Sequence, residues 1–209
     1  MFFDWIQRKR HAKGYGIHSP FAFNFITKVV YNPCAYNAFF DIEKILAKNK
    51  LSPDEITEFN RLSFRLVNYF RPKTILEVNS RTGINTMFIT APYKNIRCFC
   101  YEKNASSEET AKKLQQNWGR TIFFVEYIDL QEKFDAIFVD PVHKTISSDN
   151  LFTISHDDTF WLIKGIDSKY GRTLWQEILN DERARITFDM RKHGIVILKK
   201  SYHKLNYLI

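Results

Sequence analysis

From Lys73 onward, short apolar segments alternate with segments of helical periodicity. Five strands are expected, at Thr74–Val78, Ile96–Tyr101, Thr121–Val125, Phe134–Val139 and Thr159–Ile163. Helices are expected between or after most of them, at Ile84–Ala91, Ala105–Trp118, a short stretch from Ser147, and Tyr170–Leu179. This alternation is the signature of βαβ units, which build a mostly parallel sheet with helices packed on its faces.

Two further strands, Arg185–Asp189 and Gly194–Lys199, follow the last helix. The link Met190–His193 is too short for the crossover that parallel neighbours need, so these strands must form an antiparallel hairpin. A dinucleotide-binding fold keeps its sheet parallel, and a flavodoxin-like fold stops after five strands. The closing hairpin therefore narrows the choice among α/β folds.

The first 70 residues are expected to be helical. Helices are predicted after Ser19-Pro20 and over Ala38–Lys48, where apolar residues recur at helical spacing. Ser52-Pro53, with Glu55 closing a capping box, predicts the start of a helix that runs to about Phe70.

The composition fits one globular domain with an appendage. The chain has 209 residues, of which 44% are hydrophobic, which is enough to bury a core. We expect a helical N-terminal extension over residues 1–52 and a Rossmann-like domain over residues 53–209. No apolar run reaches the roughly 18 residues that a membrane span needs.

Three cysteines bear on the redox compartment. Cys34, Cys98 and Cys100 lack metal-ligand spacing, and the last two share one face of a predicted strand, where they pack as small hydrophobes. Unpaired cysteines are typical of a reducing compartment, so a cytoplasmic location is expected.

The net charge of +8 is concentrated at the two ends of the chain. Residues 1–30 carry five Lys or Arg and one Asp, and residues 183–209 carry seven and one, so the remainder is slightly acidic. Basic ends could bind nucleic acid. More often they are solvated flanks, and no nucleic-acid-binding motif is present, so nucleic acid is the less favoured partner.

Two strand ends carry a family resemblance. The first expected strand continues as Glu77-Val78-Asn79-Ser80-Arg81-Thr82-Gly83, and the second ends Cys100-Tyr101-Glu102. With the closing hairpin, residues from about 53 to 200 resemble the class I S-adenosylmethionine-dependent methyltransferases, most of all the small O-methyltransferase-like members. The resemblance implies an α/β, Rossmann-like sheet of seven strands in the order 3-2-1-4-5-7-6, with the last strand antiparallel. The opening Gly14–Phe21 also resembles the start of bacterial methyltransferase-like proteins.

The resemblance implies a cofactor site for S-adenosylmethionine. The family's first motif is Glu-x-Gly-x-x-x-Gly, in which glycines let the backbone turn tightly beside the cofactor. Glu77 and Gly83 match, Ser80 lies in the same loop, and Asn79 replaces the first glycine. Asn tolerates positive φ better than other non-glycine residues, so the turn can persist. Arg81 could pair with the cofactor's carboxylate, but it has the same charge as the sulfonium.

Further roles are implied at the ends of the next strands. Glu102 would accept hydrogen bonds from both ribose hydroxyls, and Ile128 with Asp129 would contact the adenine. Asp140 and His143 would face the methyl acceptor, with His143 taking its proton.

Metal-dependent members of the family bind a divalent cation at the position of Asp140, with acidic residues after the fifth strand. Lys164 stands there instead, so no metal is expected.

The sequence predicts methyl transfer from S-adenosylmethionine to an oxygen or nitrogen of a small-molecule acceptor. Two alternatives stay open. One is an inactive, methyltransferase-like binding or scaffold protein, and the other is a protein that binds or modifies nucleic acid through its basic ends. The acceptor and the oligomeric state, a homodimer among the options, are not determined.

Overall fold

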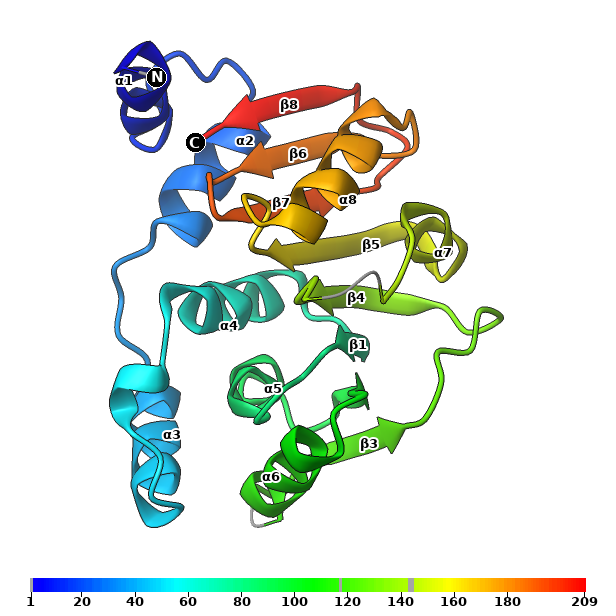
Figure 1. Ribbon diagram of the computed structural model, residues 1–209. Helices are drawn as coiled ribbons and strands as arrows, with labels where there is room; N and C mark the ends of the chain where they lie inside the picture. Colours follow the sequence, from blue (N-terminus) through cyan, green and yellow to red (C-terminus); the bar gives the residue numbers. More distant parts are fainter. Residues whose placement is uncertain (1, 117, 143–144) are drawn as a thin grey trace.

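A single eight-stranded sheet forms the centre of the computed structural model, which describes residues 2–116, 118–142 and 145–209 (Figure 1). The strand order is β3-β2-β1-β4-β5-β7-β6-β8. The strands are β1 (Thr74–Val78), β2 (Arg97–Tyr101), β3 (Thr121–Val125), β4 (Phe134–Val139), β5 (Ser155–Lys164), β6 (Ile186–Asp189), β7 (His193–Ile197) and β8 (Leu205–Leu208). Strand β7 is antiparallel to both β5 and β6, and the other pairs are parallel. The predicted order 3-2-1-4-5-7-6 and the closing hairpin are confirmed.

The eighth strand was not predicted. Strand β8 pairs in parallel with β6, with Ile186 opposite Leu205, and extends the expected seven-stranded sheet by one edge strand. Its four residues, Leu-Asn-Tyr-Leu, are too few for a periodic signal. Main-chain pairing with β6, which no local pattern encodes, is what makes this segment a strand.

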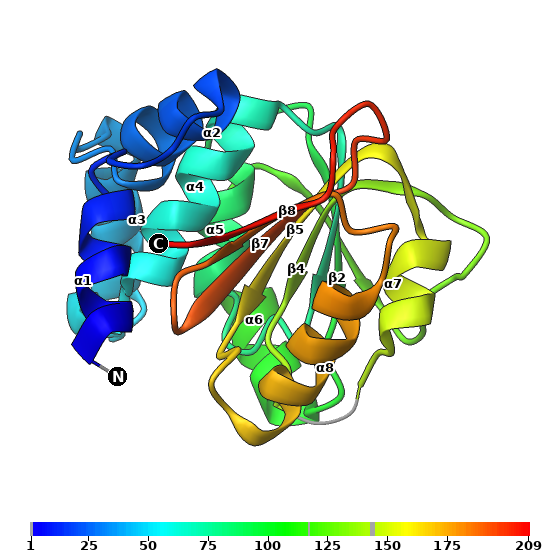
Figure 2. The ribbon, with the colours of Figure 1, turned by 90° about the horizontal axis from the view of Figure 1, so that it is seen from above.

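Helices cover both faces of the sheet. They are α1 (Phe2–His11), α2 (Pro20–Phe25), the π-helical η1 (Ile26–Val30), α3 (Asn37–Lys48), the 3-10 turn η2 (Pro53–Glu55), α4 (Glu58–Phe70), α5 (Ile84–Thr90), α6 (Ala105–Gln115), α7 (Ser148–Thr153) and α8 (Lys169–Asn180). Figure 2 shows α4 and α5 on one side of the sheet and α7 with α8 on the other. Within the described ranges, no helix combines the length and apolar character needed to cross a bilayer.

The expected element bounds differ most from the structure at the start of α4 and at the start of β5. The capping box of Ser52 and Glu55 exists, but the turn it starts ends at Glu55, and a separate helix begins at Glu58. Asn60 supplies the second cap, since its Oδ1 accepts a hydrogen bond from the backbone N–H of Thr57 at 2.8 Å. Strand β5 begins at Ser155, earlier than expected, because that residue already pairs with Phe134 ahead of an irregularity in the β4–β5 register.

The strand pleat divides the core into two layers. Ile75 and Phe138 point to the side of α4, whereas Leu76, Ile137 and Trp161 point to the side of α8. The segment α2–η1 contributes to the first layer, where the Phe25 ring lies 5.0 Å from that of Phe188 in β6. Part of the N-terminal extension therefore shares a hydrophobic core with the sheet.

The two ends of the chain lie side by side. Arg8 in α1 forms an ion pair of 2.8 Å with Asp189 at the end of β6. His11 Nδ1 lies 2.8 Å from the carbonyl oxygen of Leu208 in β8. The first helix thus packs against the edge strand that sequence analysis missed (Figure 1).

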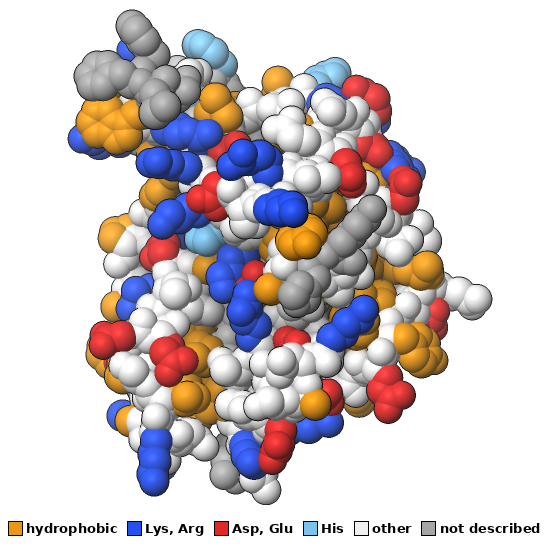
Figure 3. All heavy atoms as spheres, in the orientation of Figure 1, with side chains coloured by type: hydrophobic (Ala, Val, Ile, Leu, Met, Phe, Trp, Pro, Cys, Tyr) orange, Lys and Arg blue, Asp and Glu red, His pale blue; other side chains and the backbone are white. Residues whose placement is uncertain are grey.

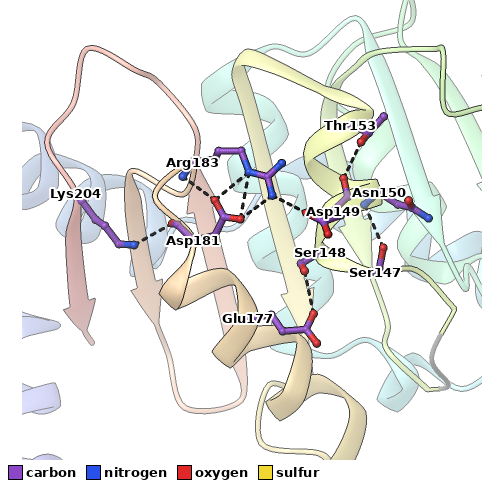
Figure 4. Close-up of polar contacts among 9 residues, drawn as sticks. All are labelled: Ser147, Ser148, Asp149, Asn150, Thr153, Glu177, Asp181, Arg183 and Lys204. Atoms are coloured by element: carbon purple, nitrogen blue, oxygen red, sulfur yellow. Dashed lines mark hydrogen bonds and ion pairs between the residues drawn. The ribbon is translucent and has the colours of Figure 1, made fainter.

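An arginine ties α7 to the segment between α8 and β6 (Figure 4). Arg183 forms ion pairs with Asp181 and Asp149, both at 2.7 Å, and its guanidinium lies 4.0 Å from the centre of the Phe152 ring. Hydrogen bonds to Asp181 and then Asp149 raise the pKa of Arg183 above its usual value. Ser148 donates to Glu177 at 2.9 Å, which adds a direct link between α7 and α8.

Replacing Phe25 by Ala tests the shared core. Phe25 is 1% exposed, so its loss should lower the free energy of unfolding by about 3–5 kcal/mol. Phe40→Ala is the matched control because Phe40 is 55% exposed, and its effect should stay below about 1 kcal/mol. Urea unfolding followed by circular dichroism measures both, and equal effects would contradict a shared core.

Candidate functional site

Two adjoining cavities lie where β1, β2 and β4 end. The first, of about 140 Å³, is lined by residues of the β1–α5 loop, by Asp140 and Lys164, and by the start of α4. The second, of about 440 Å³, is lined by Glu102, by the residues that follow it and by Val142. Asn79 and Arg81 line both cavities, so the loop after β1 separates them.

This loop turns sharply because three of its residues adopt positive φ. They are Asn79 (φ 61°), Arg81 (φ 51°) and Gly83 (φ 78°). Asn79 takes the expected glycine position, and its side-chain amide donates to the carbonyl oxygen of Asp140 at 2.7 Å and to Thr145 Oγ1 at 3.1 Å. The residue that replaces the glycine therefore also fastens the loop after β1 to the loop after β4.

Gly83 is required by both conformation and space. Besides the positive φ, a Cβ atom at this position would lie 2.9 Å from the Cβ of Ala111 in α6. The Gln115 amide, also in α6, donates to the Gly83 carbonyl at 2.7 Å. Helix α6 thus packs directly on the start of α5, where only glycine leaves room.

Glu77 is a buried carboxyl group on the wall of the first cavity. Its oxygens accept hydrogen bonds from Asn85 Nδ2 at 2.8 Å and from Thr86 Oγ1 at 2.6 Å. Burial raises the pKa of Glu77 to about 7, and these hydrogen bonds, with a weaker one from Cys100, oppose the rise. The group therefore changes charge near neutral pH.

Glu102 lies at the end of β2, beside the larger cavity. Its Oε2 accepts from the backbone N–H of Arg81, and its Oε1 accepts from the backbone N–H of Asn104, both at 2.8 Å. The carboxylate thus orients two loops. Each of its oxygens has a second lone pair that can accept another hydrogen bond.

Asp140 joins two cations at the end of β4. Its Oδ2 lies 2.7 Å from Arg81 Nε and 3.0 Å from Lys164 Nζ. Lys164 comes from the end of β5, and its ammonium also lies 5.7 Å from the centre of the Phe59 ring. An ammonium group therefore occupies the position beside Asp140 where a metal-dependent site would need a further acidic ligand.

Other predicted site residues lie apart from these cavities. Asp129 is exposed and caps its own turn, because its Oδ1 accepts from the Gln131 N–H at 2.9 Å. Ile128 packs against the hydrophobic layer on the α8 side. Neither lines either cavity. His143 and Lys144 lie outside the described residues.

The structure adds residues that sequence analysis did not select. Asn60 in α4 donates to Asn85 Oδ1 at 3.2 Å, and Asn85 in turn donates to Glu77. His193 is the strand partner of Lys164, and its ring lies 5.1 Å from Phe59. Burial and then the Lys164 charge lower the pKa of His193 to about 4, which leaves the imidazole neutral at neutral pH. These residues come from distant segments without a shared motif.

Within the part of the chain that the structure describes, one group of potential metal ligands stands out. It consists of Glu77, Cys98 and Cys100, whose ligand atoms all lie within 4.8 Å of one another. All three are buried, and the pKa values of both thiols are raised. A hydrogen bond with Cys100 and then burial raise the pKa of Cys98, and burial raises the pKa of Cys100. Because metal binding requires thiolates, these raised pKa values disfavour a metal there.

Comparison with solved structures decides the fold. An O-methyltransferase from Bacillus cereus in complex with S-adenosylhomocysteine aligns over 81% of this chain and 94% of its own, with a TM-score of 0.58 and 13% identity. The chain has a class I methyltransferase fold. An S-adenosylhomocysteine-bound methyltransferase from Podospora anserina shares this methyltransferase fold (79% and 89% covered, TM-score 0.58, 10% identity). An O-methyltransferase from Streptomyces achromogenes in complex with S-adenosylmethionine does so too (79% and 91% covered, TM-score 0.54, 11% identity). No family model matches the chain, and no curated protein matches it.

Gly83→Ala should destabilise the methyltransferase fold by about 2–3 kcal/mol, because it adds a steric overlap with α6 to the strain of a positive φ. Gly119→Ala separates the two causes. Gly119 has φ 65° but no atom within 4 Å of its would-be Cβ, so only the strain of about 1 kcal/mol applies. Thermal unfolding checks the difference, and equal losses would mean that α6 does not restrict the loop.

The raised pKa of Glu77 makes stability depend on pH in a defined direction. Between pH 4.5 and about 7 the folded protein holds a proton on Glu77 that the unfolded chain has released. Stability therefore falls as pH rises through this window, by on the order of 3 kcal/mol. The Glu77→Gln variant should lack this pH-dependent loss of stability. Its free energy of unfolding should therefore rise relative to that of the original protein as pH increases from 5 to 8. Chemical unfolding at several pH values measures the difference, and a constant difference would contradict the raised pKa.

Proposed function

We propose that this protein transfers a methyl group from S-adenosylmethionine to an oxygen or nitrogen of a small-molecule acceptor, without a metal ion. Glu102 carries the proposal, because it places a carboxylate with free lone pairs at the end of β2, beside a cavity of about 440 Å³. Adjacent hydroxyls of a ribose are the groups that such a carboxylate binds well. Proteins of the same fold with S-adenosylmethionine or S-adenosylhomocysteine bound support this choice of cofactor.

The residues around the cavities fit such a cofactor. Ser80 Oγ is buried in the loop after β1 and has no hydrogen-bond partner among the described residues, so a bound ligand would satisfy it. The Arg81 charge, which would repel a sulfonium, is offset by Asp140 at 2.7 Å. In this proposal Glu77, Asn79, Ser80 and Gly83 shape the site for the amino-acid part, and Glu102 binds the ribose. The expected contact of Ile128 and Asp129 with the adenine stays a prediction, since neither residue lines either cavity.

The chain's own residues would mainly orient the reactants. S-adenosylmethionine supplies the electrophilic methyl group when bound. Asp140 uses Oδ2 for both cations, which leaves Oδ1 among the described residues to accept a hydrogen bond from the acceptor's hydroxyl or amine. Holding the nucleophile in line with the methyl carbon supplies most of the rate in such a transfer. His143 keeps its expected role as proton acceptor in this proposal.

Metal independence rests on Lys164. Its ammonium lies 3.0 Å from Asp140 and would repel a divalent cation there. We also propose a cytoplasmic location, in line with three cysteines that form no disulfide.

A binding protein without catalytic activity is the second candidate. The observation that favours it is the Asn79 side chain, which spans to Asp140 and Thr145 across the space that a glycine would leave open. Cofactor binding without methyl transfer, tested across hydroxyl and amine acceptors, would identify this case.

Calorimetric titration with S-adenosylmethionine and S-adenosylhomocysteine tests the proposal. Binding is expected, and Glu102→Gln should weaken it at least tenfold, because one charged acceptor and about 1.5–3 kcal/mol of hydrogen bonding are lost. Glu126→Gln is the control, since Glu126 is exposed and lines neither cavity. No binding at millimolar cofactor, or equal weakening in both variants, would contradict the proposed site.

A further inference from the structure

The fold brings the two basic ends of the chain together. Residues 1–30 and 183–209, which carry the excess positive charge, meet where Arg8 contacts Asp189 and His11 contacts the carbonyl of Leu208. Charges that are far apart in the sequence therefore act on the same region of solvent. On the face drawn in Figure 3, Lys and Arg side chains gather beside α1 and continue toward the middle of the face.

A chain of contacts between neighbouring segments leads from α1 to the cavities. Asp189, the partner of Arg8, also accepts from the backbone N–H of Arg191 in the β6–β7 turn. The carbonyl of Lys192, next in that turn, accepts from the Ile166 N–H just beyond Lys164. Lys164 and Arg81 then meet at Asp140. We define the basic strip as the cations along this path: Lys9, Arg10, Arg191, Lys192, Lys164 and Arg81.

The end of the strip at α1 and the β6–β7 turn carries positive charge that no ion pair neutralises among the described residues. The carboxylates along the path are Asp140, Asp167 and Asp189, with Glu77 and Glu102 at the cavities, and two of the aspartates already pair with cations. Lys9, Arg10, Arg191 and Lys192 are exposed, and none of them forms an ion pair within the described ranges. Unpaired cations in a row match the regular negative charge of a phosphodiester backbone.

Exposed aromatic rings accompany the α1 end of the strip. Trp5 in α1 is 53% exposed, and the Lys9 ammonium lies 4.8 Å from the centre of its ring. Tyr15, whose backbone N–H donates to the Arg10 carbonyl, is 62% exposed. Aromatic rings beside a basic groove are the platforms on which unpaired bases stack.

We propose that the basic strip binds single-stranded nucleic acid, with phosphates on the cations and bases against the aromatic rings of the α1 region. Lys9, Arg10 and Lys192 line neither cavity, unlike Arg81 and Lys164, so nucleic-acid binding by these three can be tested separately from the proposed methyl transfer. It gives the basic ends a role that their sequence alone did not favour. A nucleic-acid strand bound along this strip would end at the cavities. Single-stranded nucleic acid should therefore be included among the methyl acceptors that are assayed.

The test measures binding of a fluorescein-labelled RNA of about 16 nucleotides by anisotropy, from about 50 to 200 mM salt. The triple variant K9E/R10E/K192E removes three strip cations. Its dissociation constant should rise at least tenfold, and the slope of log affinity against log salt should shrink by about 2. The neutral variant K9Q/R10Q/K192Q should show a smaller change in the same direction.

The control variant K73E/K94E/K200E makes the same change in net charge at exposed lysines away from the strip. It should bind RNA much as the original protein does. Equal loss in both triple variants, no RNA binding at 50 mM salt, or binding of phosphatidylserine vesicles in place of RNA would overturn the proposal. Titration with S-adenosylmethionine should be unchanged in the strip variants, which separates this proposal from the cofactor site.

Discussion

Strand β1 is the constraint on which the rest of the structure depends. It is paired on both edges, with β2 and β4, and its residues are buried or nearly so on both faces. Where β1 ends, the chain turns sharply into α5, with three positive φ angles between Asn79 and Gly83. Asn79 and Arg81 in this turn line both cavities and form hydrogen bonds to the ends of β4 and β2.

Polar groups buried near the end of β1 need hydrogen-bond or ion-pair partners within the protein. Glu77 stays inside the protein because Asn85, Thr86 and Cys100 all donate hydrogen bonds to it, and even so its pKa reaches about 7. Nearby, Asp140 holds two cations that would otherwise repel each other across the mouth of the first cavity. Desolvation and ion pairing thus set the charge of the site more than the number of charged residues does.

Charges on the protein surface act differently from the charges in the buried site. Surface charges contribute little to stability one by one, but they add up over the distance on which a charged partner feels them. Pairing of β8 with β6 and docking of α1 against β8 bring the two basic segments together. The edge strand is short, yet it determines where the positive charge of the protein is concentrated.

Much of the fold could be predicted from the sequence. Apolar strands and helix caps are local signals, and the predicted four-residue link Met190–His193 excluded a parallel crossover. The order 3-2-1-4-5-7-6 was what the family resemblance implied. The positions of Glu77, Gly83, Glu102 and Asp140 at strand ends also followed, because a parallel sheet brings its carboxyl ends to one edge. Local signals failed at Pro53–Phe70, where a second cap competed with the first, and at β8, where no periodicity was available.

The sequence by itself determined which residues stand at the ends of the strands and that Asn79 and Lys164 replace expected family residues. Only the tertiary structure decided what those residues contact. Asn79 reaches the β4 loop, Lys164 pairs with Asp140, Asn60 supports Glu77 through Asn85, and Asp129 lies apart from the cavities. The physical reason is that hydrogen bonds, ion pairs and burial depend on distance in space. Local sequence patterns report only on neighbours along the chain.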